Sequence, residues 1–183
     1  TADQNSRSKW FKNKIKVRKK LSFDRKKDFV IFPEIFAHFA KKLCADKKIP
    51  YAIFALNGYT LKPTNDYKNL EESYKKAKFI LSVSKDISKC VEFAFPYCSK
   101  KIFRTSLSID KRNFNFKVKK TKLITYMPRK LPQHSELVMF FLRKYMPKSW
   151  KVKRIENIKE NKVYNLLLKP KIFLTFTQFE GLG

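Results

Sequence analysis

Short apolar runs alternate along the chain with segments whose apolar residues recur at helical spacing. In the first half, the apolar runs predict buried strands at 28–33, 49–56, 79–84 and 101–108. The segments between them predict helices at 34–48, 68–77 and 85–97. The first of these helices carries apolar residues at Ile35, Phe36, Phe39, Ala40 and Leu43. The dipeptide Asn57-Gly58 after the second run is a turn signal.

The same alternation starts again after a charged stretch at 110–120, which we interpret as a linker with a domain boundary near residue 118. Pro132 suits the first turn of a helix. The second half predicts strands at 122–127, 150–155 and 171–177 and helices at 132–147 and 160–169.

Strands that are apolar throughout and alternate with helices indicate an α/β fold with parallel sheets covered on both faces. We therefore predict two Rossmann-like lobes, both incomplete. Residues 1–117 form part of the first lobe and residues 118–183 begin the second. The chain starts without Met and ends just after a glycine-rich strand exit, so we expect a fragment of a longer reading frame.

Composition excludes several classes of protein. The three glycines are too few and too scattered for a complete dinucleotide fingerprint or phosphate loop. No apolar run is long enough to span a bilayer, and the polar N-terminal stretch predicts no signal peptide. Three cysteines without a Cys-x-x-Cys pair predict reduced thiols in a cytoplasmic protein.

The formal net charge of +28 points to an anionic partner, but its composition qualifies this. Of the basic residues, 35 are Lys and 8 are Arg, as expected from an AT-rich genome, and a lysine-coated solvent face explains most of them. Residues 7–27 are more concentrated, with 11 Lys or Arg around Trp10, Phe11 and Leu21. We call residues 7–27 the basic arm. Three interpretations stay open: it binds RNA, it rests on the anionic inner face of a membrane, or it is an ordinary solvated helix and loop.

Candidate chemistry is sought where strands end, because ligands of parallel sheets bind at that edge. Arg129 and Lys130 lie between a strand and a helix start, where a diphosphate can be held. Glu180, with Gly181 and Gly183, follows the last strand and can contact a sugar or phosphate. His38 reads as a packed residue and His134 as a surface residue near the basic exit. No residue cluster predicts a metal site.

The run from Tyr126-Met-Pro-Arg129-Lys130 to Phe179-Glu180-Gly-Leu-Gly183 resembles the C-terminal lobe of group-1 retaining glycosyltransferases of the two-Rossmann-lobe (GT-B) type. The Phe-Glu-Gly-Leu-Gly run matches the start of that family's Glu-x7-Glu motif. Its second glutamate would fall beyond Gly183, and Pro128-Arg129 stands in place of the usual Gly-Arg. The resemblance extends over about residues 28–183 in the order of elements, and the nearest relatives that we expect are rhamnosyltransferase-like enzymes of bacterial polysaccharide assembly.

The resemblance implies a nucleotide-diphosphate-sugar donor and a glycan or lipid-linked acceptor, with neither metal nor additional cofactor. Arg129 and Lys130 would neutralise the diphosphate, and Glu180 would be the catalytic contact to the donor sugar, with Gly181 and Gly183 beside it. The first lobe would face the acceptor, and Asn57, Gly58 and Tyr59 would lie on that side or in the cleft. The fragment alone is expected to be inactive.

Two other hypotheses stay open. A basic α/β protein could bind RNA or DNA through the arm at 7–27, although we do not expect nucleic acid as the partner. Another nucleotide-binding Rossmann enzyme could carry Gly181-Leu-Gly183 as a truncated fingerprint, but such fingerprints usually follow the first strand of a domain.

Overall fold

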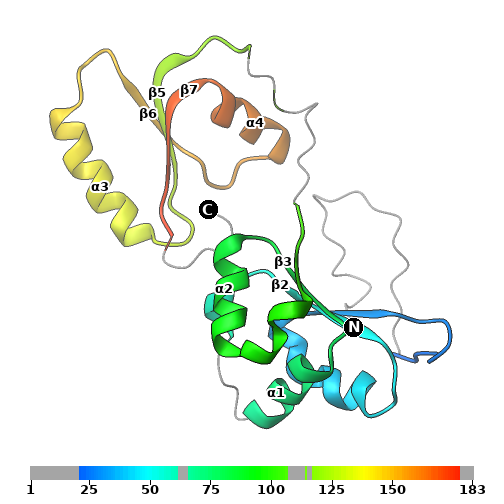
Figure 1. The fold of residues 1–183 in the computed structure, drawn as a ribbon. Coiled ribbons are helices and arrows are strands. Elements are labelled where there is room, and N and C mark those ends of the chain that lie inside the picture. Colours follow the sequence, from blue (N-terminus) through cyan, green and yellow to red (C-terminus); the bar gives the residue numbers. More distant parts are fainter. Residues whose placement is uncertain (1–20, 62–65, 107–113, 115–116, 178–183) are drawn as a thin grey trace. The chain divides into compact units, whose positions relative to one another are not determined.

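The computed structural model describes residues 21–61, 66–106, 114 and 117–177. The chain divides between Leu107 and Ser108 into two compact units. Each unit is built around its own parallel sheet with helices between the strands (Figure 1). The predicted α/β class with two Rossmann-like sheets is confirmed. The predicted boundary near 118 stays a prediction, because most of 107–116 lies outside the described residues.

The described residues of unit 1 form four strands in the order β1-β2-β3-β4, and all three pairs are parallel. Its first three strands begin and end within two residues of the predicted positions, whereas the fourth is shorter than the predicted 101–108. The strands are β1 Val30–Pro33, β2 Tyr51–Ala55, β3 Phe79–Ser82 and β4 Ile102–Arg104. The helices are η2 Glu34–Phe39, η3 Lys41–Ala45, η4 Gly58–Thr60, α1 Tyr67–Lys76, α2 Lys85–Ala94 and η5 Pro96–Lys101.

The sheet of unit 1 is covered unequally on its two faces. Each strand adds to the same side of the previous one, so right-handed crossovers place the intervening helices on one face. On that face the paired residues Phe32, Ile53 and Ile80 are buried. On the other face Phe79 and Phe103 are about half exposed, and their rings meet edge to face at 5.5 Å. In the described part of unit 1, helices therefore cover one face, where covering of both was predicted.

The segment after β1 differs from the single α-helix predicted at 34–48. It forms a 3₁₀ helix (η2) followed by one turn of π-helix (η3). The backbone N–H of Lys41 donates to Ser73 Oγ of α1 at 2.9 Å instead of continuing a regular helical ladder. Small buried residues, Ala37 and Ala40, face the sheet, while Phe36 is half exposed. The small inward residues let this segment approach the sheet closely.

Two buried tyrosines lie in the core of unit 1 with different hydrogen bonding. The Tyr51 hydroxyl donates to the backbone carbonyl of Ser73 at 2.7 Å. The Tyr74 ring stacks on Phe95 with ring centroids 4.1 Å apart, and its hydroxyl has no hydrogen-bond partner among the described residues. Burial raises the pKa of both hydroxyls, so both stay protonated.

The C-terminus of α1 is capped by a lysine from the last 3₁₀ helix. Lys101 Nζ donates to the carbonyls of Tyr74, Lys75 and Ala77 at 2.8, 2.6 and 3.1 Å. These carbonyls belong to the helix end, where backbone acceptors lack helical partners and the helix dipole favours a cation. This lysine therefore ties the entrance of β4 to the end of α1.

In the described part of unit 2, three parallel strands lie in the order β6-β5-β7. Its elements are β5 Thr121–Met127, α3 Pro132–Tyr145, β6 Lys151–Arg154, α4 Glu160–Leu168 and β7 Pro170–Thr175. The chain first steps from β5 to β6 on one side, then crosses to β7 on the other, so α3 and α4 lie on opposite faces of the sheet (Figure 1). Both faces of this sheet are covered, as predicted.

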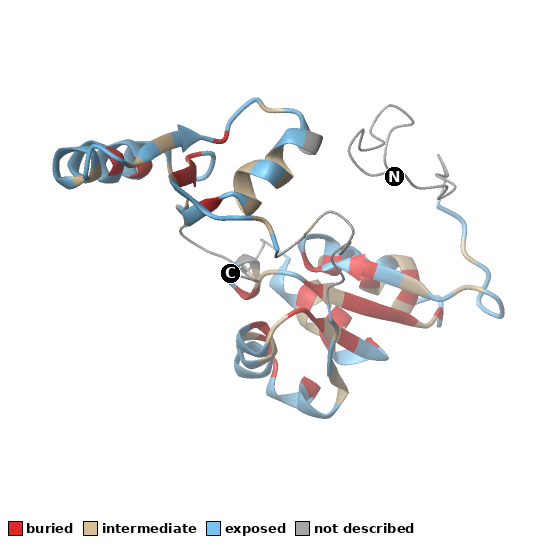
Figure 2. Cartoon of the chain, turned by 90° about the horizontal axis from the view of Figure 1, so that it is seen from above, coloured by how far each residue is buried: buried red, intermediate tan, exposed pale blue. Residues whose placement is uncertain are grey.

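Unit 2 buries less than unit 1. Buried residues follow the strands of unit 1, whereas α3 is largely exposed and most described residues of α4 are partly buried (Figure 2). The described hydrophobic residues of unit 2 that are buried are Ile124, Tyr126, Met139 and Ile155. Thr125 is buried on the α4 face and donates its hydroxyl to the carbonyl of Leu166 at 2.9 Å. None of the described helices is long and apolar enough to cross a bilayer.

The two buried tyrosines give a paired test of the core. Tyr51→Phe removes a buried hydrogen bond and should lower the free energy of unfolding by about 1 kcal/mol. Tyr74→Phe removes a buried hydroxyl without a partner and should raise it, or leave it unchanged, because desolvation of that hydroxyl is no longer needed. Urea denaturation followed by circular dichroism measures both. Equal losses from the two variants would contradict this hydrogen-bond assignment.

Candidate functional site at the strand ends

The carboxyl ends of the three strands of unit 2 lie side by side. Met127 pairs with Thr175, and Tyr126 pairs with both Arg154 and Leu174. The edge where β5, β6 and β7 end is therefore a single row. Strand β5 is central, and the chain leaves β5 and β6 toward opposite faces. This is the switch point at which ligands bind in open parallel sheets.

Arg129 and Lys130 follow the central strand at this edge. Pro128 is fully buried and anchors the end of β5, whereas the next two residues are exposed. Arg129 has no ion pair or hydrogen bond with any residue in the described part of the chain. The predicted basic exit therefore presents a guanidinium group at the switch point.

Helix α3 begins directly after this basic pair and has no capping side chain. Its N-cap is Leu131, and Pro132 occupies the first turn as predicted. Ser135 does not cap the helix either, because its hydroxyl donates back to the carbonyl of Pro132 at 2.7 Å. The first N–H groups of an uncapped helix carry partial positive charge. Together with Arg129 and Lys130, they can hold a phosphate.

A third cation near the edge is already neutralised. Arg154, the last residue of β6, lies 2.6 Å from a Glu136 oxygen on α3 and 2.9 Å from a Glu156 oxygen. The hydrogen bond with Glu156 raises the pKa of the Arg154 guanidinium. Because two carboxylates bind this arginine, Arg129 is better placed than Arg154 to meet an anion.

The second half of the predicted donor site cannot be placed. Glu180, Gly181 and Gly183 lie outside the described residues, so their predicted roles stay predictions. The last described residues after β7 include Phe176, whose ring meets Tyr126 edge to face at 6.5 Å. The chain thus leaves β7 beside the central strand, at the same edge as Arg129.

The predicted turn at Asn57-Gly58 in unit 1 makes local capping and packing contacts. Asn57 Oδ1 accepts the backbone N–H of Tyr59 at 3.0 Å and caps the short helix η4. Gly58 lies against α2, where an added Cβ would come within 2.6 Å of the Cys90 Cβ. Tyr59 is half exposed. These contacts explain Asn57 and Gly58 structurally, and the acceptor-side role of the three residues stays a prediction.

Glu34 lies at the carboxyl edge of the unit 1 sheet and is not among the predicted site residues. Its side chain is buried at the end of β1, and Oε2 accepts the backbone N–H of Leu56 at 3.1 Å. It therefore holds the end of β2 beside the end of β1. The available signal was a carboxylate directly after an apolar strand, which marks a strand exit.

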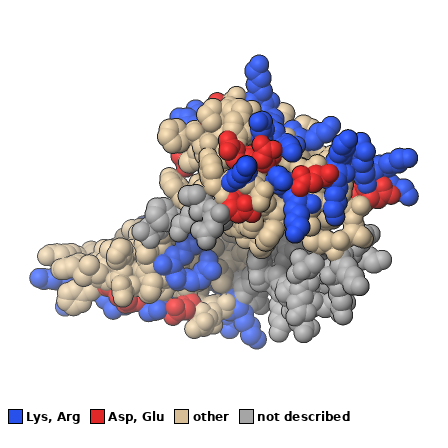
Figure 3. Space-filling view, turned by 90° about the horizontal axis from the view of Figure 1, so that it is seen from below, with Lys and Arg blue, Asp and Glu red and all other residues tan. Residues whose placement is uncertain are grey.

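A second basic region lies on the α4 side of unit 2. A hollow of about 640 Å³ is lined by four lysines whose spacing along the chain had not suggested a group. Figure 3 shows Lys and Arg side chains in scattered groups on the visible surface, with acidic ones among them. The lysines and asparagines of the hollow are Lys153, Asn157, Lys159, Lys162, Asn165 and Lys169. All four ammonium groups belong to exposed residues, as in a solvated face.

Within the described residues, the histidines and cysteines belong to no cluster that could hold a metal ion. His38 is partly buried, with its ring 3.9 Å from the Phe39 ring, and His134 is exposed in the first turn of α3. No group of three acidic, His or Cys residues gathers in the described parts of the chain. Cys44, Cys90 and Cys98 are free thiols, and burial raises the pKa of Cys44 to about 11.

Comparison with known proteins adds little. No protein-family model matches the sequence, and no curated protein matches it. Among solved structures, the accessory secretory protein 1, 2 and 3 of Streptococcus pneumoniae is similar over 82% of this chain, with 13% sequence identity and a TM-score of 0.40. The chain spans about a third of that protein, at 32% of its length. A likeness this weak identifies neither a family nor a function.

The packing of Gly58 predicts a stability effect. Gly58→Ala places a methyl group against the Cys90 Cβ and should lower the free energy of unfolding by roughly 1–3 kcal/mol. Adding Cys90→Ala should not restore stability, because the closest atom, the Cβ, remains. Urea denaturation of the single and double variants, with Cys90→Ala alone as control, measures this. A stable Gly58→Ala variant would contradict the close approach.

Proposed function

We propose that the protein is a retaining glycosyltransferase chain that binds a nucleotide-diphosphate sugar at the carboxyl edge of unit 2. The observation that supports this most is Arg129 at the end of the central strand, beside the uncapped start of α3. This arrangement joins a forked cation to a positive helix end at a switch point. The Phe-Glu-Gly-Leu-Gly run follows β7 in the sequence and adds the sequence resemblance.

The reaction needs charge stabilisation more than a strong nucleophile. The bond between the anomeric carbon and the β-phosphate oxygen breaks, and the acceptor oxygen bonds that carbon on the same face. The acceptor's proton ends on the departing diphosphate, which gains negative charge as it leaves. Arg129, Lys130 and the start of α3 stabilise this charge, a task that a metal ion performs in other transferases.

Glu180 and the two glycines complete the donor site in this proposal. Its carboxylate hydrogen-bonds hydroxyls of the donor sugar and steadies positive charge at the anomeric carbon. Gly181 and Gly183 let the backbone approach the sugar and phosphates closely. The acceptor, a glycan or lipid-linked saccharide, lies at the carboxyl edge of unit 1 near Asn57 and Tyr59. The protein works in the cytoplasm at the inner face of a membrane.

Calorimetric titration tests the donor site. UDP-glucose, GDP-mannose and dTDP-rhamnose serve as probes, with the free nucleoside diphosphates beside them. Arg129→Ala should weaken binding of sugar nucleotide and free diphosphate alike, by roughly tenfold or more, because a hydrogen bond to a charged group is lost. Lys122→Ala, at the opposite end of the same strand, is the matched control and should change nothing.

Glu180→Gln separates the two halves of the site. It should weaken sugar-nucleotide binding but leave free nucleoside diphosphate unaffected, because the carboxylate contacts the sugar. If none of the probes binds, and RNA binds with steep salt dependence instead, the nucleic-acid hypothesis replaces this one.

A further inference from the structure

Helix α3 is apolar on two opposite sides. Met139 and Ser135 are fully buried against the sheet. An α-helix turns by about 100° per residue, so Leu137 and Phe141, two positions before and after Met139, point roughly the opposite way. Leu137 is 58% exposed and Phe141 51% exposed, and Phe140 beside them is 67% exposed. A helix on the surface of a sheet normally turns polar residues outward.

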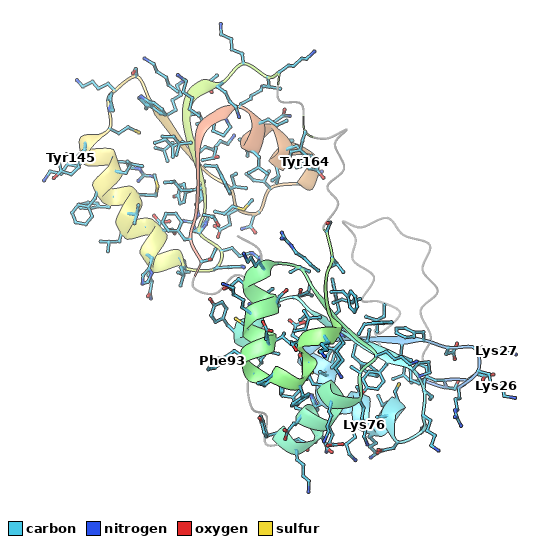
Figure 4. All side chains as sticks on the ribbon, in the orientation of Figure 1. Lys26, Lys27, Lys76, Phe93, Tyr145 and Tyr164 are labelled. Atoms are coloured by element: carbon cyan, nitrogen blue, oxygen red, sulfur yellow. The ribbon has the colours of Figure 1, made fainter. Side chains whose placement is uncertain are left out.

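The exposed apolar surface extends to the last residue of the helix. Tyr145 is 75% exposed and points away from the body of unit 2 (Figure 4). Next to it lies an apolar hollow of about 340 Å³ whose lining includes Met146 and Trp150. We call Leu137, Phe140, Phe141 and Tyr145 the α3 apolar face. It is contiguous along two turns of helix, whereas the exposed Phe93 of α2 stands in a different unit.

Basic residues lie at the C-terminal end of the α3 apolar face. Arg143 and Lys144 lie in the last turn of α3, and Lys148 follows it. Lys144 Nζ lies 5.6 Å from the centre of the Tyr145 ring. Helix α3 contains one acidic residue, Glu136, and its carboxylate pairs with Arg154. The charge beside the apolar face is therefore positive.

We propose that the α3 apolar face docks the protein on an anionic membrane surface. Leu137, Phe140 and Phe141 enter the boundary between headgroups and acyl chains, and the flanking cations meet lipid phosphates. The tyrosine suits the interface, because its ring is apolar and its hydroxyl stays hydrated. This inference does not rest on the proposed function, since it uses a face of α3 and not the strand edge.

Charge and side-chain type favour this occupant over two others. A second copy of the chain would also carry a net charge of +28, and repulsion between the two copies opposes association. RNA would match the charge, but its bases need open aromatic faces. Phe140 and Phe141 meet edge to face, with centroids 5.5 Å apart and planes at 79°, and the aliphatic Leu137 offers no stacking surface.

Vesicle cosedimentation of the whole chain tests the proposal. Vesicles of phosphatidylcholine with phosphatidylglycerol should bind the protein, and phosphatidylcholine alone should bind it weakly. Phe140→Ser and Leu137→Ser should each lower the partition coefficient by about tenfold, and the double variant by more, because buried apolar area drives insertion. Phe93→Ser, which removes a 90% exposed phenylalanine from α2, is the matched control and should bind as the unaltered chain does.

Trp150 provides a second readout. In a Trp10→Phe variant it is the remaining tryptophan, and its emission should shift to shorter wavelength when anionic vesicles are added. Circular dichroism should show that the outward-facing substitutions leave the helix content and melting temperature unchanged. The loss in binding should persist at high salt, because the apolar contribution is not screened.

Three results would overturn the proposal. The double variant could bind anionic vesicles as tightly as the unaltered chain, which would assign binding to the basic arm at 7–27. Sedimentation equilibrium could show a dimer that the same variants dissolve, which would make the face a contact between copies. RNA could shift the emission of Trp150 while vesicles leave it unchanged, which would assign the face to nucleic acid. Nucleotide-sugar titration of the same variants keeps this test separate from that of the donor site.

Discussion

Parallel pairing of every described strand is the constraint on which the rest of the structure depends. Parallel neighbours need a crossover, and right-handed crossovers decide which face each helix covers. In unit 1 the crossovers all step the same way, so Phe79 and Phe103 line a face without described helices. In unit 2 the direction reverses, so α3 and α4 cover opposite faces and a switch point forms at β5. The same pairing aligns the strand ends and puts Arg129 at that point.

Positive charge and exposed apolar surface occur together in this protein, and their combination is more informative than either alone. Lysines scattered over a surface need no partner, as the lysine-lined hollow beside α4 illustrates. Arg129 differs because it adjoins an uncapped helix start. The cations of α3 differ because they border Leu137, Phe140 and Phe141, which water does not favour. A donor site and a membrane-facing helix would together suit transfer to an acceptor held at a membrane.

Element types were readable from the sequence, whereas their detailed geometry was not. Strands such as Phe79–Ser82 and Thr121–Met127 were predicted within a few residues, because buried parallel strands are short apolar runs. The segment 34–48 was wrong as one α-helix, because a tertiary hydrogen bond from Lys41 to Ser73 interrupts its ladder. Arg129 was found at a strand exit by pattern alone. Glu34 was missed, because its partner Leu56 is distant in the sequence.

The sequence by itself determined the α/β class, the alternation of elements and the cations at the end of β5, because these follow from local periodicity and from residues next to a strand. Only the tertiary structure decided which strands are neighbours, and hence which faces are covered. It also showed that Gly58 is needed for packing on Cys90, that Arg154 is neutralised by two carboxylates, and that α3 turns apolar side chains outward. Each of these depends on contacts between residues distant in the chain, which local pattern does not encode.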